Sequence, residues 1–175
     1  MRKVTYGAAC SLDGYIAGAD GSLDWLRWSK DVSRLTSGYW TNVDTVVMGR
    51  KTYNAARAQG GGAYPGVTNY VFSRTLTEVP EDVKLVRGNA EDFVRTLKAA
   101  EGGEICVMGG GELAQTLFAA GLIDEVGANI HPIVLGSGVP LFQPLEARVE
   151  LELLRCEPIA HGCVYVIYRV VHQPG

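Results

Sequence analysis

The sequence contains none of the cysteine patterns that build a metal site or a disulfide framework. Its four cysteines are scattered, with no CxxC motif and no grouping with histidine: Cys10, Cys106, Cys156 and Cys163. A structural zinc site and a set of disulfides are therefore not expected, and no metal ligands are predicted. Reduced thiols are the simpler state for such cysteines, which indicates a cytoplasmic protein.

The chain also lacks a long apolar segment and an excess of basic charge. No window approaches the ~20 apolar residues that are needed to span a bilayer. The 16 basic and 19 acidic residues give a formal net charge of -3. Nucleic acids and anionic membranes attract a concentrated basic surface instead. We therefore expect neither a nucleic acid nor a membrane as the main partner.

Glycine is the residue type that is present in excess. It accounts for 22 of the 175 residues, compared with a usual share of about 7%. Such enrichment indicates backbone positions with positive φ, or places where the main chain closely approaches a ligand. The length fits one domain over residues 1–175, and a hydrophobic content of 47% is typical of globular proteins.

Strand and helix signals alternate along most of the chain. Strands are expected over residues 3–10, 44–48, 68–73, 83–87 and 104–108, and later over 124–130, 148–156 and 162–171. Helices are expected over residues 29–42 with Ser29 as cap, from 51, from Asn89, and over 112–120 up to Gly121. Because the early strands alternate with helices, whereas the last two strands follow one another without a helix, we predict an α/β fold. Its sheet is mixed and mainly parallel, with an antiparallel C-terminal edge.

Two of the expected strands turn into helices through glycine, a pattern typical of phosphate binding. The residues concerned are Gly49, Arg50, Lys51 and Thr52 in the first turn, and Gly109, Gly110, Gly111 and Glu112 in the second. A glycine lets the main chain approach a ligand, and the following helix offers unpaired N–H groups and a positive dipole end. Two such turns in one small sheet suit a dinucleotide pyrophosphate. The alternative is that these glycines only satisfy tight turns.

The second turn does not indicate a standard Rossmann domain. Gly109, Gly111 and Ala114 fit G-x-G-x-x-A, but that fingerprint normally follows the first strand of its domain. Ser73 and Arg74 close another expected strand. A hydroxyl and a guanidinium there could bind the 2′-phosphate that distinguishes NADPH from NADH. The alternative for Arg74 is an ordinary solvated arginine.

Five segments, in this order, resemble the dihydrofolate-reductase-like superfamily: SLDGYIA at 11–17, DTVVMGRKT at 44–52, VFSR at 71–74, ICVMGGGEL at 105–113 and LGSGVPLF at 135–142. The superfamily includes dihydrofolate reductases, the reductase domain of riboflavin biosynthesis and stand-alone bacterial members, and the last segment most resembles the stand-alone group. The resemblance implies the dihydrofolate-reductase-like three-layer fold, with helices on both faces of the sheet and NADPH lying across it. It also implies a homodimer.

The resemblance carries cofactor contacts over to residues of this chain. It implies phosphate contacts for Gly49, Arg50, Lys51, Thr52, Gly110, Gly111, Glu112 and Leu113, a 2′-phosphate contact for Ser73 and Arg74, and nicotinamide contacts for Ala9 and Ile16. Two of the positions that depart from the superfamily lie within these segments. Glu112 stands where dihydrofolate reductases often have a basic residue, and Tyr15 stands where riboflavin reductases usually carry lysine.

The sequence is therefore interpreted as an NADPH-dependent reductase that transfers a hydride to a small heterocycle, pterin-like or pyrimidine-like. By resemblance, Asp31 is the carboxylate that binds the substrate and serves catalysis; the alternative is that it only favours a helix N-terminus. Trp25, with Tyr15 and Trp28, is expected to form an aromatic wall for the substrate. Asp13 is expected to make only an Asx turn. The rivals are a non-catalytic nucleotide-binding module and a structural protein without cofactor.

Overall fold

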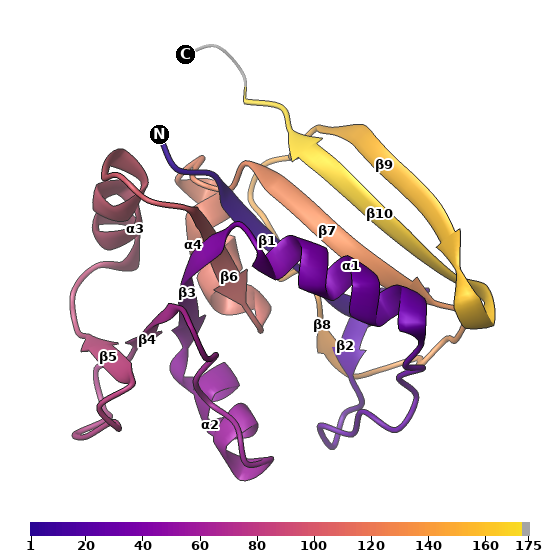
Figure 1. The fold of residues 1–175 in the computed structure, drawn as a ribbon, viewed down its shortest axis with the longest axis horizontal. Coiled ribbons are helices and arrows are strands. Elements are labelled where there is room, and N and C mark those ends of the chain that lie inside the picture. Colours follow the sequence, from indigo (N-terminus) through magenta and orange to yellow (C-terminus); the bar gives the residue numbers. More distant parts are fainter. Residues whose placement is uncertain (173–175) are drawn as a thin grey trace.

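An eight-stranded sheet runs through the centre of the computed structural model, which describes residues 1–172 (Figure 1). Its strands lie in the order β5-β4-β3-β6-β1-β7-β10-β9. Their bounds are Val4–Ser11 (β1), Val43–Gly49 (β3), Thr68–Phe72 (β4), Val83–Val86 (β5), Glu104–Met108 (β6), Glu125–His131 (β7), Leu151–Ile159 (β9) and Cys163–Val170 (β10). The helices are Lys30–Trp40 (α1), Arg50–Ala58 (α2), Ala90–Ala99 (α3) and Gly111–Ala119 (α4).

The sheet is parallel from β5 to β7 and antiparallel at its other end. β3 pairs in parallel with β4 and β6, and β1 pairs in parallel with β6 and β7. β10 lies antiparallel between β7 and β9. This topology confirms the predicted mixed sheet with an antiparallel C-terminal edge. Because parallel strands end at the same edge of a sheet, the carboxyl ends of β1, β3, β4, β6 and β7 lie together.

Successive residues of the central strands point to opposite faces, and each face has its own core. On β6, Ile105 and Val107 pack in one cluster, whereas Cys106 packs in the other. The first cluster includes Val94 of α3 and Leu117 of α4, both fully buried. The helices α3 and α4 therefore cover one face of the sheet.

The second cluster contains the buried Tyr53 of α2, with Tyr39 and Trp40 of α1 packed against it. The helices α1 and α2 therefore cover the other face, and Figure 1 shows α1 crossing in front of the strands. The three-layer arrangement that the resemblance implied is confirmed.

Local capping signals placed the ends of α1 and α3 correctly. The Ser29 hydroxyl accepts a hydrogen bond from the Val32 N–H at 3.2 Å, which begins α1 at Lys30. Asn89 accepts from the N–H groups of Glu91 and Asp92 and so begins α3. Gly121 has a φ of 64°, as expected for a left-handed residue just after a helix.

The segment 11–22, whose Gly, Asp and Ser residues predict a loop, contains the short strand β2 (Tyr15–Ala17). β2 pairs with the equally unexpected β8 (Val139–Pro140) in a small separate sheet. The two backbones approach so closely that a Cβ on Gly138 would lie 2.1 Å from the Ala17 carbonyl oxygen. Strands this short carry no periodicity, so only the pairing partner reveals them.

The strand expected over residues 148–156 lies at 151–159 instead, as β9. β9 and β10 form the hairpin edge, and their register shifts between Ile167 and Tyr168. A short turn over Ala160–Gly162 joins them, with His161 at a φ of 64°. Within residues 1–172, no helix is both long enough and apolar enough to cross a membrane.

Candidate active site

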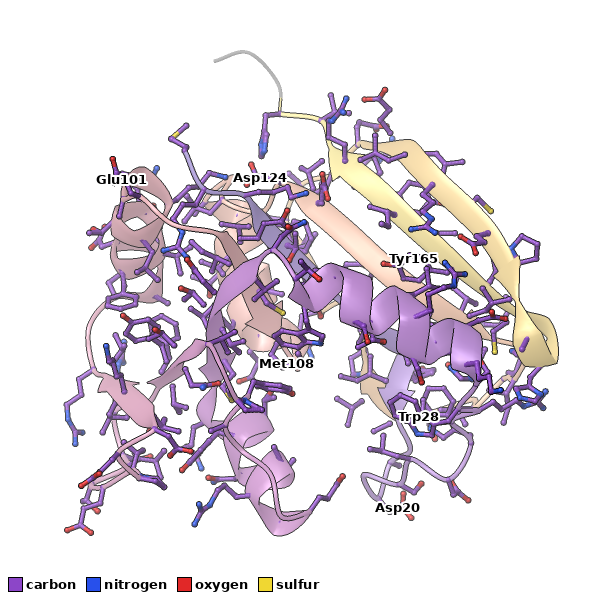
Figure 2. The ribbon with its side chains drawn as sticks, in the orientation of Figure 1. Asp20, Trp28, Glu101, Met108, Asp124 and Tyr165 are labelled. Carbon is purple, nitrogen blue, oxygen red and sulfur yellow. The ribbon has the colours of Figure 1, made fainter. Side chains whose placement is uncertain are left out.

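The predicted phosphate-binding segments come together at the carboxyl edge of the sheet. β3, β4 and β6 are neighbours, and they end at Gly49, Phe72 and Met108. The turns that follow carry Arg50 to Thr52, Ser73 to Arg74, and Gly109 to Leu113. The structure therefore places at one edge three segments that are far apart in sequence. Met108, at the end of β6, lies between α1 and α2 in Figure 2.

The two helices at this edge differ from the other two helices in how they begin. α1 and α3 have side-chain caps from Ser29 and Asn89, whereas α2 and α4 begin at Gly49 and Gly110 with no side-chain cap hydrogen bond. An uncapped N-terminus leaves backbone N–H groups unpaired and a positive dipole end exposed. α2 and α4 follow the adjacent strands β3 and β6, so two such ends lie side by side. This arrangement suits an anion with more than one phosphate group.

A hydrogen bond joins the starts of α2 and α4 and holds them at a fixed spacing. The Gly110 N–H donates a hydrogen bond to Thr52 Oγ1 of α2 over 3.0 Å. Gly109 has a φ of 88°, and a Cβ there would lie 2.1 Å from Thr52 Cγ2. The position therefore requires glycine both for its conformation and for the close contact. Thr52, which was predicted to contact phosphate, also positions the second turn.

An ion pair joins the same two helices at the surface. Lys51 Nζ of α2 lies 2.5 Å from Glu112 Oε1 in the first turn of α4, and both side chains are mostly exposed. Arg50 is exposed beside it, whereas Leu113 is half-buried and packs against the core. The first turns of α2 and α4 thus carry two cationic side chains and one carboxylate.

Ser73 and Arg74 lie side by side but differ in exposure. Ser73 is buried, and its Oγ accepts hydrogen bonds from the N–H groups of Thr75 at 3.2 Å and Leu76 at 3.0 Å. The hydroxyl therefore shapes the turn after β4, which is a second role beside the predicted phosphate contact. Arg74 is exposed at this turn. Its guanidinium is available to an anion at the same edge as Arg50.

Small residues line the floor of the sheet beneath α1. Ala9 belongs to the face of β1 that α1 and α2 cover, because Tyr6 and Cys10 pack in the opposite cluster. Gly7 of β1 and Gly127 of β7 are register partners on the same face as Ala9. A Cβ on Gly7 would lie 1.9 Å from the Gly127 carbonyl oxygen, so glycine at this position allows the close approach of β1 and β7. Ile16 of β2, predicted with Ala9 to contact the nicotinamide, is half-buried and packs against the other cluster, which includes Tyr6 and Cys10.

Asp31 lies on the row of α1 that faces the sheet, with Leu35 and Tyr39 at helical spacing. Its Oδ2 accepts a hydrogen bond from the Ala160 N–H at 3.0 Å. One oxygen of the predicted substrate carboxylate therefore holds the tip of the β9–β10 hairpin. Arg34 of α1 reinforces this contact through an ion pair with Glu157 at 2.8 Å.

The tryptophans expected to form an aromatic wall do not share one surface. Trp25 is buried, whereas Trp28 is 71% exposed. Trp25 packs edge-on against His131, with ring centroids 5.3 Å apart, and no described residue accepts a hydrogen bond from its Nε1. Burial and the nearby Arg27 charge lower the pKa of His131. His131 is itself buried, so it packs with Trp25 in the interior.

Asp13 is a residue whose importance the sequence interpretation missed. Its carboxylate accepts hydrogen bonds from the N–H groups of Leu135 at 3.1 Å and Gly136 at 2.8 Å, as well as from the Ser11 hydroxyl at 2.6 Å. The Ser11 bond, followed by those from Gly136 and Leu135, lowers the pKa of Asp13. Asp13 thus ties the SLDG segment to the LGSG segment. The presence of both the SLDG and the LGSG segments in the sequence was the signal that could have indicated this contact.

Two hollows lie elsewhere on the molecule. One of about 470 Å³ is lined by Tyr53, Asn54, Arg57, Glu78, Val79 and Pro80. The other, of about 250 Å³, lies between α4, β7 and the segment before β9. Neither contains a residue predicted to bind cofactor or substrate. The predicted site is an open edge of the sheet with exposed backbone, and it is not a closed cavity.

Comparisons with known proteins assign the chain to a family. The family described as the RibD C-terminal domain matches residues 2–165. The uncharacterized protein YwjB of Bacillus subtilis (strain 168) is 36% identical over 155 residues, covering 87% of this chain and 89% of YwjB. A protein of Shewanella sp. PV-4 that is named for riboflavin biosynthesis has a similar structure, with a TM-score of 0.86, 32% identity, and coverage of 97% of this chain and 99% of that one.

The fold also extends to a more distant protein. Dihydrofolate reductase from Enterococcus faecalis, complexed with NADP(H) and RAB-propyl, has a TM-score of 0.72 at 18% identity, and each chain covers 96% of the other. At this identity the likeness shows the fold alone. The predicted dihydrofolate-reductase-like fold is confirmed.

Proposed function

The chain belongs to the RibD C-terminal domain family, and from that premise we propose that it is an NADPH-dependent reductase of a small heterocycle, pterin-like or pyrimidine-like. The observation that carries the proposal is the pair of uncapped helices α2 and α4, which begin side by side at the carboxyl edge of the sheet. Both other helices have side-chain caps. The missing caps leave room and hydrogen-bond donors for a dinucleotide.

The residues present fit such a cofactor. Gly49 has nothing within 4 Å of a built Cβ, so the start of α2 is open to a ligand. Backbone N–H groups at Gly49 to Thr52 and Gly109 to Leu113 would bind the pyrophosphate, except that of Gly110, which donates to Thr52 Oγ1. Arg50 and Lys51 would bind it as well. Arg74 and Ser73 would bind the 2′-phosphate, and Ala9 and Ile16 would face the nicotinamide. NADPH would supply the hydride.

Asp31 is proposed to bind and protonate the acceptor. Reduction of a C=N or C=O bond adds the hydride to carbon and one proton to nitrogen or oxygen, leaving NADP⁺. Asp31 lies on the sheet-facing row of α1, and no described residue donates a hydrogen bond to its Oδ1. That oxygen is free for the substrate, while Oδ2 holds the hairpin.

The first test is a titration with NADPH and, separately, NADH, followed by the fluorescence of Trp25, Trp28 and Trp40. We expect saturable binding of NADPH and much weaker binding of NADH. No binding of either nucleotide at millimolar concentration contradicts the proposal. A screen of acceptors, beginning with dihydrofolate, then separates a reductase from the alternative, a non-catalytic nucleotide-binding module, which would bind the cofactor without turnover.

The Asp31→Asn variant tests the carboxyl group with any acceptor that the screen finds. We expect turnover to fall about 100-fold, a typical loss for a general acid, with NADPH affinity unchanged. Arg34→Gln is the matched control, because Arg34 also joins α1 to the hairpin but lies outside the proposed chemistry. Equal losses in both variants would assign Asp31 to hairpin positioning alone.

We also infer that the protein is a cytoplasmic homodimer. Its four cysteines are all free, as suits a reducing compartment. β9 is an edge strand, and Leu151 and Leu153 on it are 41% and 54% exposed. They are register partners of Val170 and Tyr168, which belong to the face covered elsewhere by α3 and α4. A second copy would cover this apolar strip through a two-fold contact.

Sedimentation of the wild type and of Leu153→Arg tests the homodimer. We expect a wild-type dimer and a monomeric variant, with Glu152→Gln, whose register partner Arg169 lies on the opposite face, as a dimeric control. A monomeric wild type contradicts this inference and leaves the reductase proposal intact.

A further inference from the structure

The ion pair between Lys51 and Glu112 lies within the proposed phosphate site. It spans 2.5 Å and joins the first turns of α2 and α4, the two helices without side-chain caps. The first turn of α2 has no acidic residue, whereas the first turn of α4 has Glu112. A carboxylate therefore stands among the donors that are proposed to receive the cofactor phosphates.

A carboxylate at this position has two opposite effects. It favours α4, because a negative charge near a helix N-terminus interacts well with the helix dipole. It also occupies Lys51, and it opposes the approach of any other anion to the same donors. The two side chains are 73% and 69% exposed, so water screens the pair and the pair itself is weak. A phosphate can therefore displace Glu112 from Lys51 at modest cost.

We propose that Glu112 competes within the chain against the cofactor phosphates for Lys51 and the α4 N-terminus, and so lowers the affinity for NADPH. The inference rests on the proposed function, because it assigns a role to one residue of that cofactor site. Weaker binding would favour release of the oxidised cofactor after each turnover, and product release limits the turnover of many enzymes. Glu112 is thus a determinant of affinity, and Lys51 is the group for which the two anions compete.

The test is NADPH binding by the Glu112→Gln variant, measured by tryptophan fluorescence and by the thermal unfolding temperature with and without cofactor. Glutamine keeps the size of the side chain and removes its charge. We expect affinity to rise about fivefold, the scale of one nearby surface charge. Without cofactor the unfolding temperature should fall slightly, because α4 loses a favourable charge at its N-terminus.

Glu91→Gln is the matched control. Glu91 also lies in the first turn of a helix, α3, and pairs with Arg95 at 2.7 Å, but α3 is capped by Asn89 and lies away from the site. This variant should lose the same small amount of stability and bind NADPH as the wild type does. Tighter binding by both variants would indicate a general effect of net charge and would overturn the inference.

Lys51→Met separates competition from simple repulsion. In the wild type Lys51 is shared with Glu112, so its removal should weaken NADPH binding about twofold. In the Glu112→Gln background it should weaken binding about tenfold. Equal effects in the two backgrounds, or equal affinities of wild type and Glu112→Gln, overturn the inference while leaving the cofactor site in place. If neither protein binds NADPH, the proposed function itself fails, and this inference with it.

Discussion

The amino edge and the carboxyl edge of the parallel sheet differ in the residues that they carry. At the amino edge, where β1, β3, β6 and β7 begin, charged side chains are paired and partly buried. Arg2 is buried, and its guanidinium contacts Asp44 and Thr45 and donates to the Gly103 carbonyl oxygen at 2.7 Å. Lys98 pairs with Asp124 in the same way. Figure 2 shows Asp124 at the upper end of the strands, opposite Met108.

At the carboxyl edge, glycines and uncapped helix ends replace these pairs. Gly49 and Gly110 begin α2 and α4, and the ion pair there, Lys51 with Glu112, is exposed. Neither helix has a side-chain cap, and N–H groups left unpaired in a first helical turn cost stability unless water or a ligand satisfies them. This chain therefore stabilises its strands through ion pairs at the amino edge, and it leaves the helix starts at the carboxyl edge available for binding.

The largest expected effect comes from Arg2→Ala at the amino edge. The substitution leaves Asp44 and the Gly103 carbonyl without their shared partner, and loss of one member of a buried pair is strongly destabilising. We expect the free energy of unfolding to fall by about 3 kcal/mol, at the lower end for such pairs because Asp44 is half-exposed. Denaturant unfolding measures it.

The control for Arg2→Ala is its neighbour Lys3→Ala. Lys3 lies between Glu104 at 3.0 Å and Glu125 at 3.1 Å, but its side chain is 37% exposed. Its loss should cost less than about 1 kcal/mol. NADPH affinity should be unchanged in both variants, since neither residue reaches the carboxyl edge. Equal losses of stability would break the distinction between buried and exposed pairs.

Asp44→Asn adds a pH dependence to the same comparison. Burial alone would raise the pKa of Asp44, but the Gly103 N–H, Thr45 and Arg2 together lower it. A lowered folded pKa means that the carboxylate stabilises the fold above its unfolded pKa, about 4, and that this contribution is lost as the pH falls through the folded value.

We therefore expect Asp44→Asn to cost about 2 kcal/mol at pH 7, with the difference from wild type shrinking below about pH 4. Unfolding curves across that range measure both proteins. A residual acid dependence in the variant is expected from Asp13, whose pKa is also lowered. A constant difference down to about pH 2 would assign the loss to packing rather than to charge.

At the carboxyl edge, Thr52→Val should affect binding more than stability. The variant removes the oxygen that accepts the Gly110 N–H and so loosens the spacing of α2 and α4. We expect NADPH affinity to fall about tenfold and stability to fall by about 1 kcal/mol. Thr96→Val is the control, because the Thr96 hydroxyl only donates to the Asp92 carbonyl on an exposed face of α3. A tenfold loss there too would exclude a specific role for Thr52.

The carboxyl edge was easier to predict from sequence than the amino edge, for a physical reason. Each of the turns after β3 and β6 is a run of consecutive residues, Gly49 to Thr52 and Gly109 to Glu112. Each turn can therefore be recognised from its local sequence. The pairs at the amino edge join residues far apart, such as Arg2 and Asp44. No local pattern marks which charges will meet, because the strand order decides it.

The same limit explains the parts of the site that were missed. β2 and β8 depend on each other across more than a hundred residues, and neither is long enough to show a period. Asp13 was expected only to turn its own segment, yet its partners are Leu135 and Gly136. The hairpin contact of Asp31 required the β9–β10 register, which includes an irregularity that spacing alone does not show.

The smallest expected loss of stability is that of Arg34→Gln. Like Arg2→Ala, it removes the arginine of an arginine–carboxylate ion pair, so the two variants compare an exposed pair with a buried one. Arg34 pairs with Glu157 at 2.8 Å, with side-chain exposures of 57% and 31%. Glu157 is also bound by Arg155, so it keeps a partner after the substitution. We expect a loss of at most about 0.5 kcal/mol, decreasing further with added salt. Unfolding at low and high ionic strength measures it. A loss near that of Arg2→Ala would mean that the hairpin depends on this one contact, and that burial is not what distinguishes the ion pairs of this chain.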